Sequence, residues 1–216
     1  MDDFGPACPP CRYDPCACEE GVRFQQEEMV PKLYRTIVVD PPWNYSDKLS
    51  MGGTSGFGSG KRGTRGAAQH YHTPDLSEIA GINIGSWAAE QAHLYVWATN
   101  AFMVEAHELC KGWDFEPKTI LTWVKPQIGM GHYFRNNTEH IVFAVRGKQP
   151  TLRRDVQTSF MAPRGKHSEK PAAFYDMVES MSPGPYLDVF ARKQRFGWDA
   201  WGAEVYTPEG LPEPVR

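Results

Sequence analysis

The segment VVDPPWNY at residues 38–45 places an acid, two prolines and a tryptophan directly after a run of β-branched residues. The carboxylate of Asp40 accepts hydrogen bonds and donates none, while Pro41 and Pro42 stiffen the backbone and lack an N–H group. A carboxylate oxygen beside a backbone carbonyl can accept both hydrogens of one amino group, and Trp43 offers a flat face for stacking. The motif therefore predicts a cradle for the exocyclic amino group of a nucleobase, with a turn and a packing tryptophan as the alternative.

Contacts to a nucleic acid must come from local patches, because the net charge is -3 and the isoelectric point about 6.2. A base inside a duplex cannot reach such a cradle, so the substrate must be unpaired or flipped out. The glycine-rich segment 51–66 has too little apolar surface to order itself, and we expect it to close over the substrate unless it is only a solvated loop. The candidate contacts are basic and aromatic residues: Tyr45, Lys61, Arg62, Arg65, Tyr71, Arg153, Arg154, Arg164 and Lys166.

Four of the five cysteines lie within the first eighteen residues: Cys8, Cys11, Cys16 and Cys18. The first pair has the C-x2-C spacing that is typical of structural zinc sites, and four thiolates could complete a tetrahedron. The second pair is C-x-C, which is less usual, so a tail rich in proline and oxidisable cysteine is the alternative to a zinc site. The start of the chain has no apolar signal-peptide region, and no apolar run approaches a membrane span. We therefore expect a cytoplasmic protein.

The elements that must position Asp40 follow from hydrophobic patterns and breakers. Short apolar runs predict strands over residues 34–40, 92–99, 118–125, 139–147, 156–160, 186–191 and 200–206. Helical spacing with start and stop residues predicts helices over residues 73–82, 100–112 and 171–181. In these helices, Thr73 and Asn100 are expected as N-caps and Pro171 as the first helical residue.

This alternation of strands and helices predicts an α/β fold with a mostly parallel sheet and helices on both faces. Ligands of such sheets bind beyond the carboxyl ends of the strands, and two predicted strands carry an acid there, Asp40 and Asp188. Residues 1–32 are expected to form an appendage, residues 33–206 one domain, and residues 207–216 a tail.

Several further segments follow DPPW along the chain. YHTPDLSEI follows the motif, and LYVWATNAFMVEAHELCKGWDFEPKTILTWVK, NTEHIVFAVRG, KHSEKPAAFYDMVESMSPGPYLDVFAR and GWDAWGAE come next. Together they resemble the MT-A family of DPPW-type N6-adenine methyltransferases over residues 33–206. The resemblance implies a Rossmann-like methyltransferase sheet with permuted motif order, in which the DPPW motif precedes the cofactor half.

The same resemblance implies a site for S-adenosylmethionine. Its expected residues are Asp40, Thr138, His167, Lys170, Phe190, Arg192, Gln194, Ala203 and Glu204. Two of them depart from the family pattern: Ala203 stands where asparagine is usual, and Thr138 where the mRNA enzyme has a lysine that contacts the cofactor.

The implied function is transfer of a methyl group from S-adenosylmethionine to the N6 amino group of adenine, with Asp40, Pro41, Pro42 and Trp43 as the catalytic motif. DNA is the expected substrate, because a compact domain with a cysteine tail resembles the bacterial and phage members. An RNA N6-adenosine methyltransferase is the first alternative. The second is a catalytically silent relative that binds nucleic acid or a partner, and the intact Asp40 and Trp43 argue against it. Whether the protein is a monomer or a dimer stays open.

Overall fold

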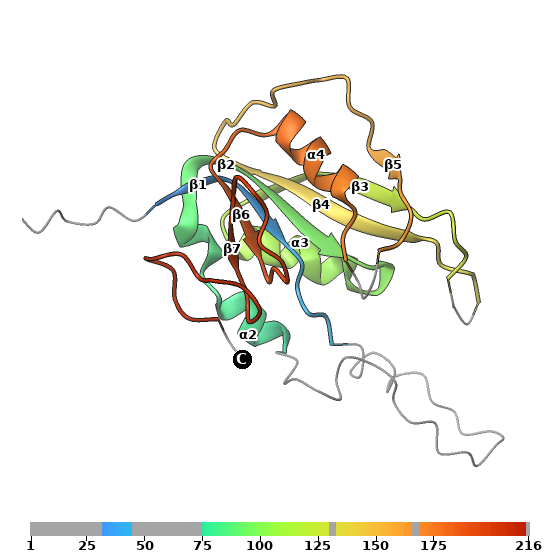
Figure 1. The fold of residues 1–216 in the computed structure, drawn as a ribbon, viewed down its shortest axis with the longest axis horizontal. Helices are drawn as coiled ribbons and strands as arrows, with labels where there is room; N and C mark the ends of the chain where they lie inside the picture. The colour runs from blue at the N-terminus through green and yellow to red at the C-terminus, as the bar shows by residue number, and fades with distance from the viewer. Residues whose placement is uncertain (1–31, 45–74, 130–132, 166–168, 215–216) are drawn as a thin grey trace, which may run out of the picture. The chain divides into compact units, whose positions relative to one another are not determined.

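The computed structural model describes residues 32–44, 75–129, 133–165 and 169–214, and these residues build one mixed sheet (Figure 1). The strands are β1 (Tyr34–Val39), β2 (Ala88–Ala98), β3 (Glu116–Val124), β4 (Thr138–Arg146), β5 (Ser159–Met161), β6 (Tyr186–Val189) and β7 (Trp198–Trp201). They are arranged in the order β5-β3-β4-β2-β1-β6-β7. Only β4 runs antiparallel to its neighbours in this sheet. The predicted α/β fold with a mostly parallel sheet is therefore confirmed.

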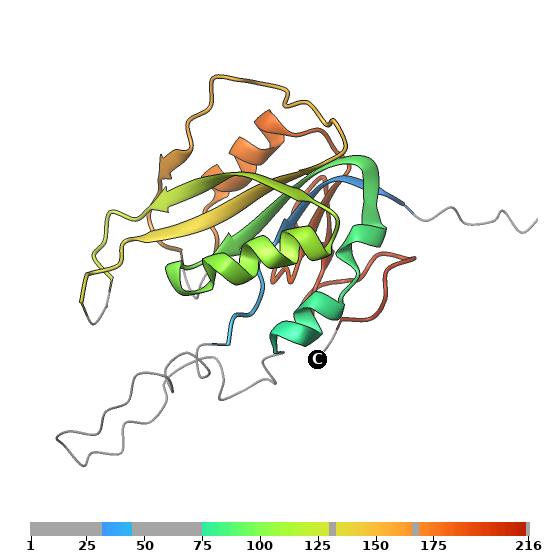
Figure 2. The ribbon, with the colours of Figure 1, turned by 180° about the vertical axis from the view of Figure 1, so that it is seen from behind.

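The helices α3 (Met103–Gly112) and α4 (Ala172–Met181) cover opposite faces of the sheet. Alternate residues of β1 show this, because Ile37 packs in the same cluster as Leu109 of α3, whereas Val38 packs with Phe174 of α4. Figure 2 shows α3 in front of the strands and α4 behind them. Because both faces are covered, residues 36–39 of β1 form a continuous buried run of β-branched residues rather than an alternating pattern.

The helix starts differ from the predictions. The short helix α2 (Leu76–Gly81) is capped by Asp75, whose side chain accepts from the backbone of Glu78 in a capping box. Thr73 lies outside the described residues. A 3-10 turn, η5 (Asn100–Phe102), precedes α3, so Asn100 begins that turn and does not cap the helix. Pro171 is the N-cap of α4 and not its first residue. A further 3-10 turn, η4 (Ile84–Trp87), leads into β2.

The last strand was predicted over residues 200–206, and this is wrong: β7 begins at Trp198 and ends at Trp201. Gly202 directly follows the strand and packs on the backbone of Ala191, because a Cβ atom on Gly202 would lie 2.4 Å from the carbonyl oxygen of Ala191. Ala203 and Glu204 therefore lie beyond the strand and are exposed. No helix in the described ranges is long and apolar enough to cross a membrane.

Candidate active site

The DPPW motif lies at the sheet edge where the parallel strands end. Asp40 directly follows β1, and its backbone N–H donates to the carbonyl of Val189 at the end of β6 (3.2 Å). The N–H of Trp43 donates to the carbonyl of Pro41 (2.8 Å), so the motif closes a tight turn. The first bond therefore ties Asp40, at the end of β1, to the end of the neighbouring strand β6.

Asp40 stands at one end of a chain of side chains with alternating charge. The Nζ atom of Lys170 lies 3.0 Å from Oδ1 of Asp40 and 3.2 Å from Oε2 of Glu139. The other carboxylate oxygen of Glu139 pairs with the buried Lys125. Lys170 lies just before α4, Glu139 is the second residue of β4, and Lys125 directly follows β3. Three separate segments therefore converge on the acid of the motif.

The charges in this network influence one another. Burial raises the pKa of Asp40, and the ammonium of Lys170 opposes the rise. Burial alone would lower the pKa of Lys170, but the carboxylates of Asp40 and Glu139 outweigh it, so the pKa is raised. Glu139 is the reverse case: burial disfavours its charge, yet the two lysines hold its pKa below the usual value. Lys170 therefore stays a cation between two acids.

The ammonium groups of Lys170 and Lys125 each lie over an indole ring. The Nζ atom of Lys170 lies 4.7 Å from the ring centroid of Trp97, and that of Lys125 lies 4.6 Å from the centroid of Trp123. The two indoles meet edge to face at 5.9 Å. An ammonium over a tryptophan face is attracted by the ring quadrupole, which partly compensates for the water that each lysine loses.

Trp43 is fixed on two sides. Its Nε1–H donates to the carbonyl of Trp97 (2.9 Å), and its ring stacks on Phe102 with centroids 4.9 Å apart and planes inclined by 13°. One face of the indole is therefore covered by the protein. A base that stacks on Trp43 would have to use the other face.

The residues expected at the cofactor site lie at the same sheet edge or beside β7. Thr138 begins β4 next to Glu139, and Phe190 follows β6 with a φ of 62°, which is rare for a bulky residue and often marks a functional position. The ring of Phe190 packs against Trp201. A pocket of about 480 Å³ opens beside β7, and its lining includes Arg192, Gln194 and Glu204.

Two expected cofactor residues do not join this group. Ala203 is exposed and does not line the pocket, and His167 lies outside the described residues. Gln194 also has a structural role, because its side-chain amide donates to the carbonyl of Trp198 (2.7 Å).

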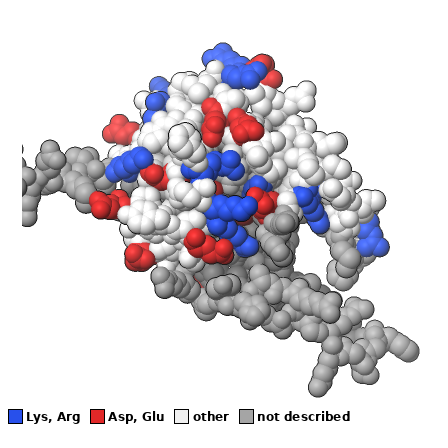
Figure 3. Space-filling view, in the orientation of Figure 1, with Lys and Arg blue, Asp and Glu red and all other residues white. Residues whose placement is uncertain are grey.

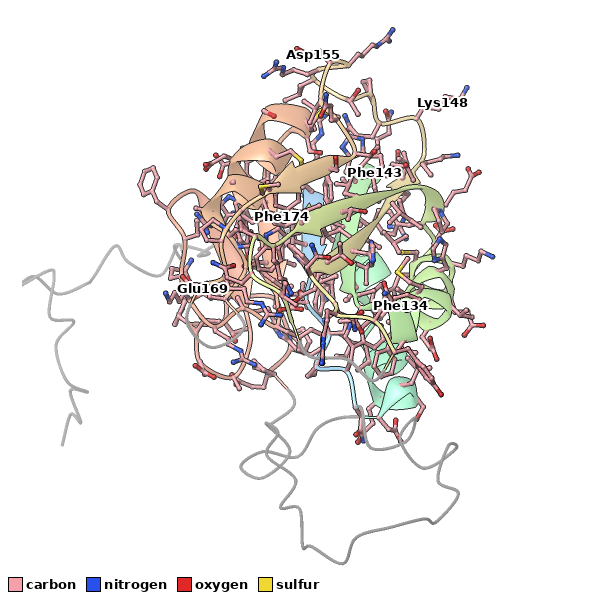
Figure 4. All side chains as sticks on the ribbon, turned by 90° about the vertical axis from the view of Figure 1, so that its right-hand side faces the viewer. Phe134, Phe143, Lys148, Asp155, Glu169 and Phe174 are labelled. Carbon is pink, nitrogen blue, oxygen red and sulfur yellow. The ribbon has the colours of Figure 1, made fainter. Side chains whose placement is uncertain are left out.

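The expected nucleic-acid contacts fall into three groups. Arg164 follows β5 at the sheet edge that carries Asp40. Arg153 and Arg154 lie at the other end of α4. The N–H of the preceding residue, Leu152, donates to the carbonyl of Met181, which is the last residue of α4. Since Lys170 precedes the start of α4, a helix length of about 15 Å separates that segment from the site. Figure 4 shows this separation, with Asp155, the ion-pair partner of Arg153, far from Glu169. The third group lies outside the described residues: Tyr45, Lys61, Arg62, Arg65, Tyr71 and Lys166.

The expected zinc ligands Cys8, Cys11, Cys16 and Cys18 also lie outside the described residues. Within the described ranges, no cluster of three or more His, Cys, Asp or Glu side chains could hold a metal ion.

Sequence reasoning did not select Glu139 and Lys125 as site residues. Their signal was present, since WVK and NTEH place a charge at each end of the β3–β4 connection. Asp188, noted as an acid at a strand end, lies inside β6 and accepts a hydrogen bond from the Tyr175 hydroxyl (2.9 Å). Burial raises the pKa of Asp188 to about 7, the Tyr175 bond opposes this rise, and the charge of Asp40 adds to it.

A mostly parallel sheet with an acid-proline-tryptophan turn at its carboxyl edge defines an α/β protein of the methyltransferase type. The family model described as MT-A70 matches residues 34–204, which is most of the chain. The chain therefore belongs to the MT-A70 family, as the sequence resemblance predicted.

Three relatives indicate the range of this family. The type II methyltransferase M.MunI of Mycoplasma sp is 33% identical over 193 residues, which cover 83% of this chain and 82% of the relative. The human N(6)-adenine-specific methyltransferase METTL4 is 28% identical over 81% of this chain and 38% of its own length. The human N(6)-adenosine-methyltransferase catalytic subunit METTL3 is 22% identical over 79% of this chain and 27% of its own length. The chain thus spans less than half of the two human proteins.

Proposed function

We propose that this protein transfers a methyl group from S-adenosylmethionine to the N6 amino group of adenine in DNA. The observation that carries the proposal is the position of Asp40: an acceptor at the end of β1, beside the Pro41 carbonyl and next to a half-buried Trp43. We place DNA before RNA because the chain matches the type II methyltransferase M.MunI over about four fifths of both proteins, whereas it matches only 27% of the length of the N(6)-adenosine-methyltransferase METTL3.

Asp40 and Pro41 provide the two acceptors that an amino group needs. The Pro41 carbonyl already accepts from Trp43 but has a second lone pair, and a carboxylate oxygen of Asp40 can accept the other hydrogen. Hydrogen bonds from both hydrogens turn the nitrogen lone pair out of conjugation with the ring and toward an incoming methyl group. Alignment of this kind supplies much of the rate in a displacement whose leaving group is already good.

Lys170 must share Asp40 with the substrate, because its ammonium lies 3.0 Å from Oδ1. Glu139 gives Lys170 a second anionic partner at 3.2 Å, so Lys170 keeps an ion pair when the amino group binds Asp40. After transfer, the substituted nitrogen carries one proton too many, and the carboxylate of Asp40 is the base beside it. A raised pKa makes Asp40 a better acceptor for that proton than an exposed aspartate.

The residues beside β7 fit the chemistry of S-adenosylmethionine. Glu204 provides an acceptor for ribose hydroxyls, as acids do in other nucleotide sites, and Arg192 a cation for a carboxylate. The pocket that they line measures about 480 Å³, within the range of small-ligand sites. When bound, the cofactor supplies an electrophilic methyl group on a sulfonium.

Identification of the methylated nucleoside tests this proposal. The protein is incubated with cofactor labelled in its methyl group and with duplex DNA, single-stranded DNA or RNA of mixed sequence, followed by digestion to nucleosides. We expect label in N6-methyladenine from DNA. Label in RNA alone would replace the DNA assignment by the adenosine alternative, and no label in any substrate would favour the silent relative.

A further inference from the structure

Two aromatic side chains stand almost fully exposed in the connection between β3 and β4. Tyr133 is 96% exposed and Phe134 85%, and Ile128 in the same connection is 77% exposed. The described parts of the connection, residues 126–129 and 133–137, project away from the sheet in both Figure 1 and Figure 2. Clustered apolar side chains at such a position cost solubility and commonly mark a binding surface.

This connection begins and ends at the candidate active site. Lys125 leaves β3, and its backbone N–H donates to the carbonyl of Asn137 (2.7 Å), which closes the base of the connection. Phe134 precedes Glu139, the partner of Lys170, by only five residues. Five extended residues span at most about 18 Å. Neighbouring bases on a strand are about 3.4 Å apart, so this span corresponds to a few nucleotides. Phe134 can therefore reach nucleotides that flank an adenine bound at Asp40.

The charges around the aromatic pair suit a polyanion. Residues 126–137 contain Arg135 and no acidic residue. The guanidinium of Arg164, which follows β5, reaches the same connection, since a Cβ on Gly129 would lie 3.2 Å from its Nη2 atom. In Figure 3, the outermost right-hand part of the molecule, where the connection projects, shows basic side chains and no acidic one.

We infer that Tyr133 and Phe134 stack on bases that flank the target adenine, while Arg135 and Arg164 bind the adjoining phosphates. This inference rests on the proposed function, because an adenine that leaves the helix to reach Asp40 unstacks its neighbours. Aromatic faces replace the lost stacking without regard to sequence, and arginines hold the backbone. The connection thus stabilises the opened substrate beside the catalytic motif.

Binding measurements across a salt series separate the two roles. A short fluorescein-labelled DNA duplex of mixed sequence, and one of its single strands, are titrated with wild type, Y133A/F134A, R164Q and the control V104A. Val104 is a 69% exposed side chain on α3. We expect Y133A/F134A to weaken binding about tenfold or more at every salt concentration without changing the slope of log Kd against log salt. R164Q should reduce that slope by about 1, and V104A should match wild type.

Unchanged affinity of Y133A/F134A for both DNA probes would overturn the inference. A change in its oligomeric state in sedimentation, with DNA affinity intact, would assign the pair to a protein contact instead and would equally overturn it. Failure of the proposed function is distinguishable: wild type would then transfer no methyl group to DNA, whatever the binding results. The melting temperature of Y133A/F134A should equal that of wild type because both side chains are exposed.

Discussion

Lys170 bridges the carboxylates of Asp40 and Glu139, so its ammonium influences how readily Asp40 ionises. Only the ionised form of Asp40 is purely an acceptor, because a protonated carboxyl donates one hydrogen itself. The residue that precedes α4 therefore has an electrostatic role in the motif that follows β1.

Lys170→Met should move the acidic limb of the pH profile of kcat/KM to higher pH. The pKa of Asp40 is already raised by burial, so activity falls as the pH drops through that raised value. Removal of the ammonium takes away the charge that opposes the rise, and the limb then appears at a higher pH. The control is Lys125→Met, which removes a cation that contacts Glu139 and not Asp40. An acidic limb at the wild-type pH in Lys170→Met would contradict this role.

At the scale of elements, the end of β7 depends on a close contact between two backbones. The N–H of Ala191 donates to the carbonyl of Trp201 (3.1 Å), and Gly202 lies against Ala191 where no side chain fits. This contact positions the segments that carry Arg192 and Glu204 on either side of the candidate cofactor pocket.

Gly202→Ala should destabilise the fold by about 1–3 kcal/mol, since the new methyl group would meet backbone atoms that cannot move independently. Gly112→Ala is the matched control, because a Cβ there meets no heavy atom within 4 Å. Its stability should equal or exceed that of wild type, as alanine is the better helix former. Thermal unfolding measures the stability of both variants. A melting temperature of Gly202→Ala equal to that of wild type would show that position 202 tolerates a side chain.

Much of this architecture could be predicted from local pattern. The buried runs of β1, β2 and β6 and the apolar faces of α3 and α4 identify the sheet and its two covered faces. The charge network could not be predicted in the same way. Glu139 stands at the amino end of β4 and reaches the carboxyl edge of the sheet only because β4 is antiparallel. Strand direction depends on pairing between distant segments, which a local pattern does not encode.

The end of the last strand was missed for a related reason. Residues 203–206 have the composition of a strand, but β7 ends at Trp201, just before Gly202 packs against the backbone of Ala191. That contact joins two segments which only the folded sheet brings together. Trp43 could be predicted only in part. The motif indicated an indole face on which a base can stack, but the stacking of the ring on Phe102 appears only in the structure.

At the scale of the whole molecule, a zinc site formed by the cysteines of residues 1–32 remains a prediction. If Cys8, Cys11, Cys16 and Cys18 bind zinc, the purified full chain should carry about one zinc ion and a chain lacking residues 1–31 none. The compact unit Lys32–Arg216 contains every described strand and helix, so the shortened chain should keep its melting temperature. Elemental analysis and thermal unfolding provide both readings, and a metal-free full chain would remove the zinc assignment.

The proposed role of Asp40 is to receive the amino group of adenine, and the rate of N6-methyladenine formation by Asp40→Ala tests this role most directly. Asp176→Ala, which removes an exposed acid from α4, is the control. We expect Asp40→Ala to abolish formation of N6-methyladenine in DNA while its circular dichroism spectrum and thermal unfolding remain those of a folded protein, and Asp176→Ala to retain full activity. Methylation of DNA by Asp40→Ala at the wild-type rate would contradict this role of Asp40.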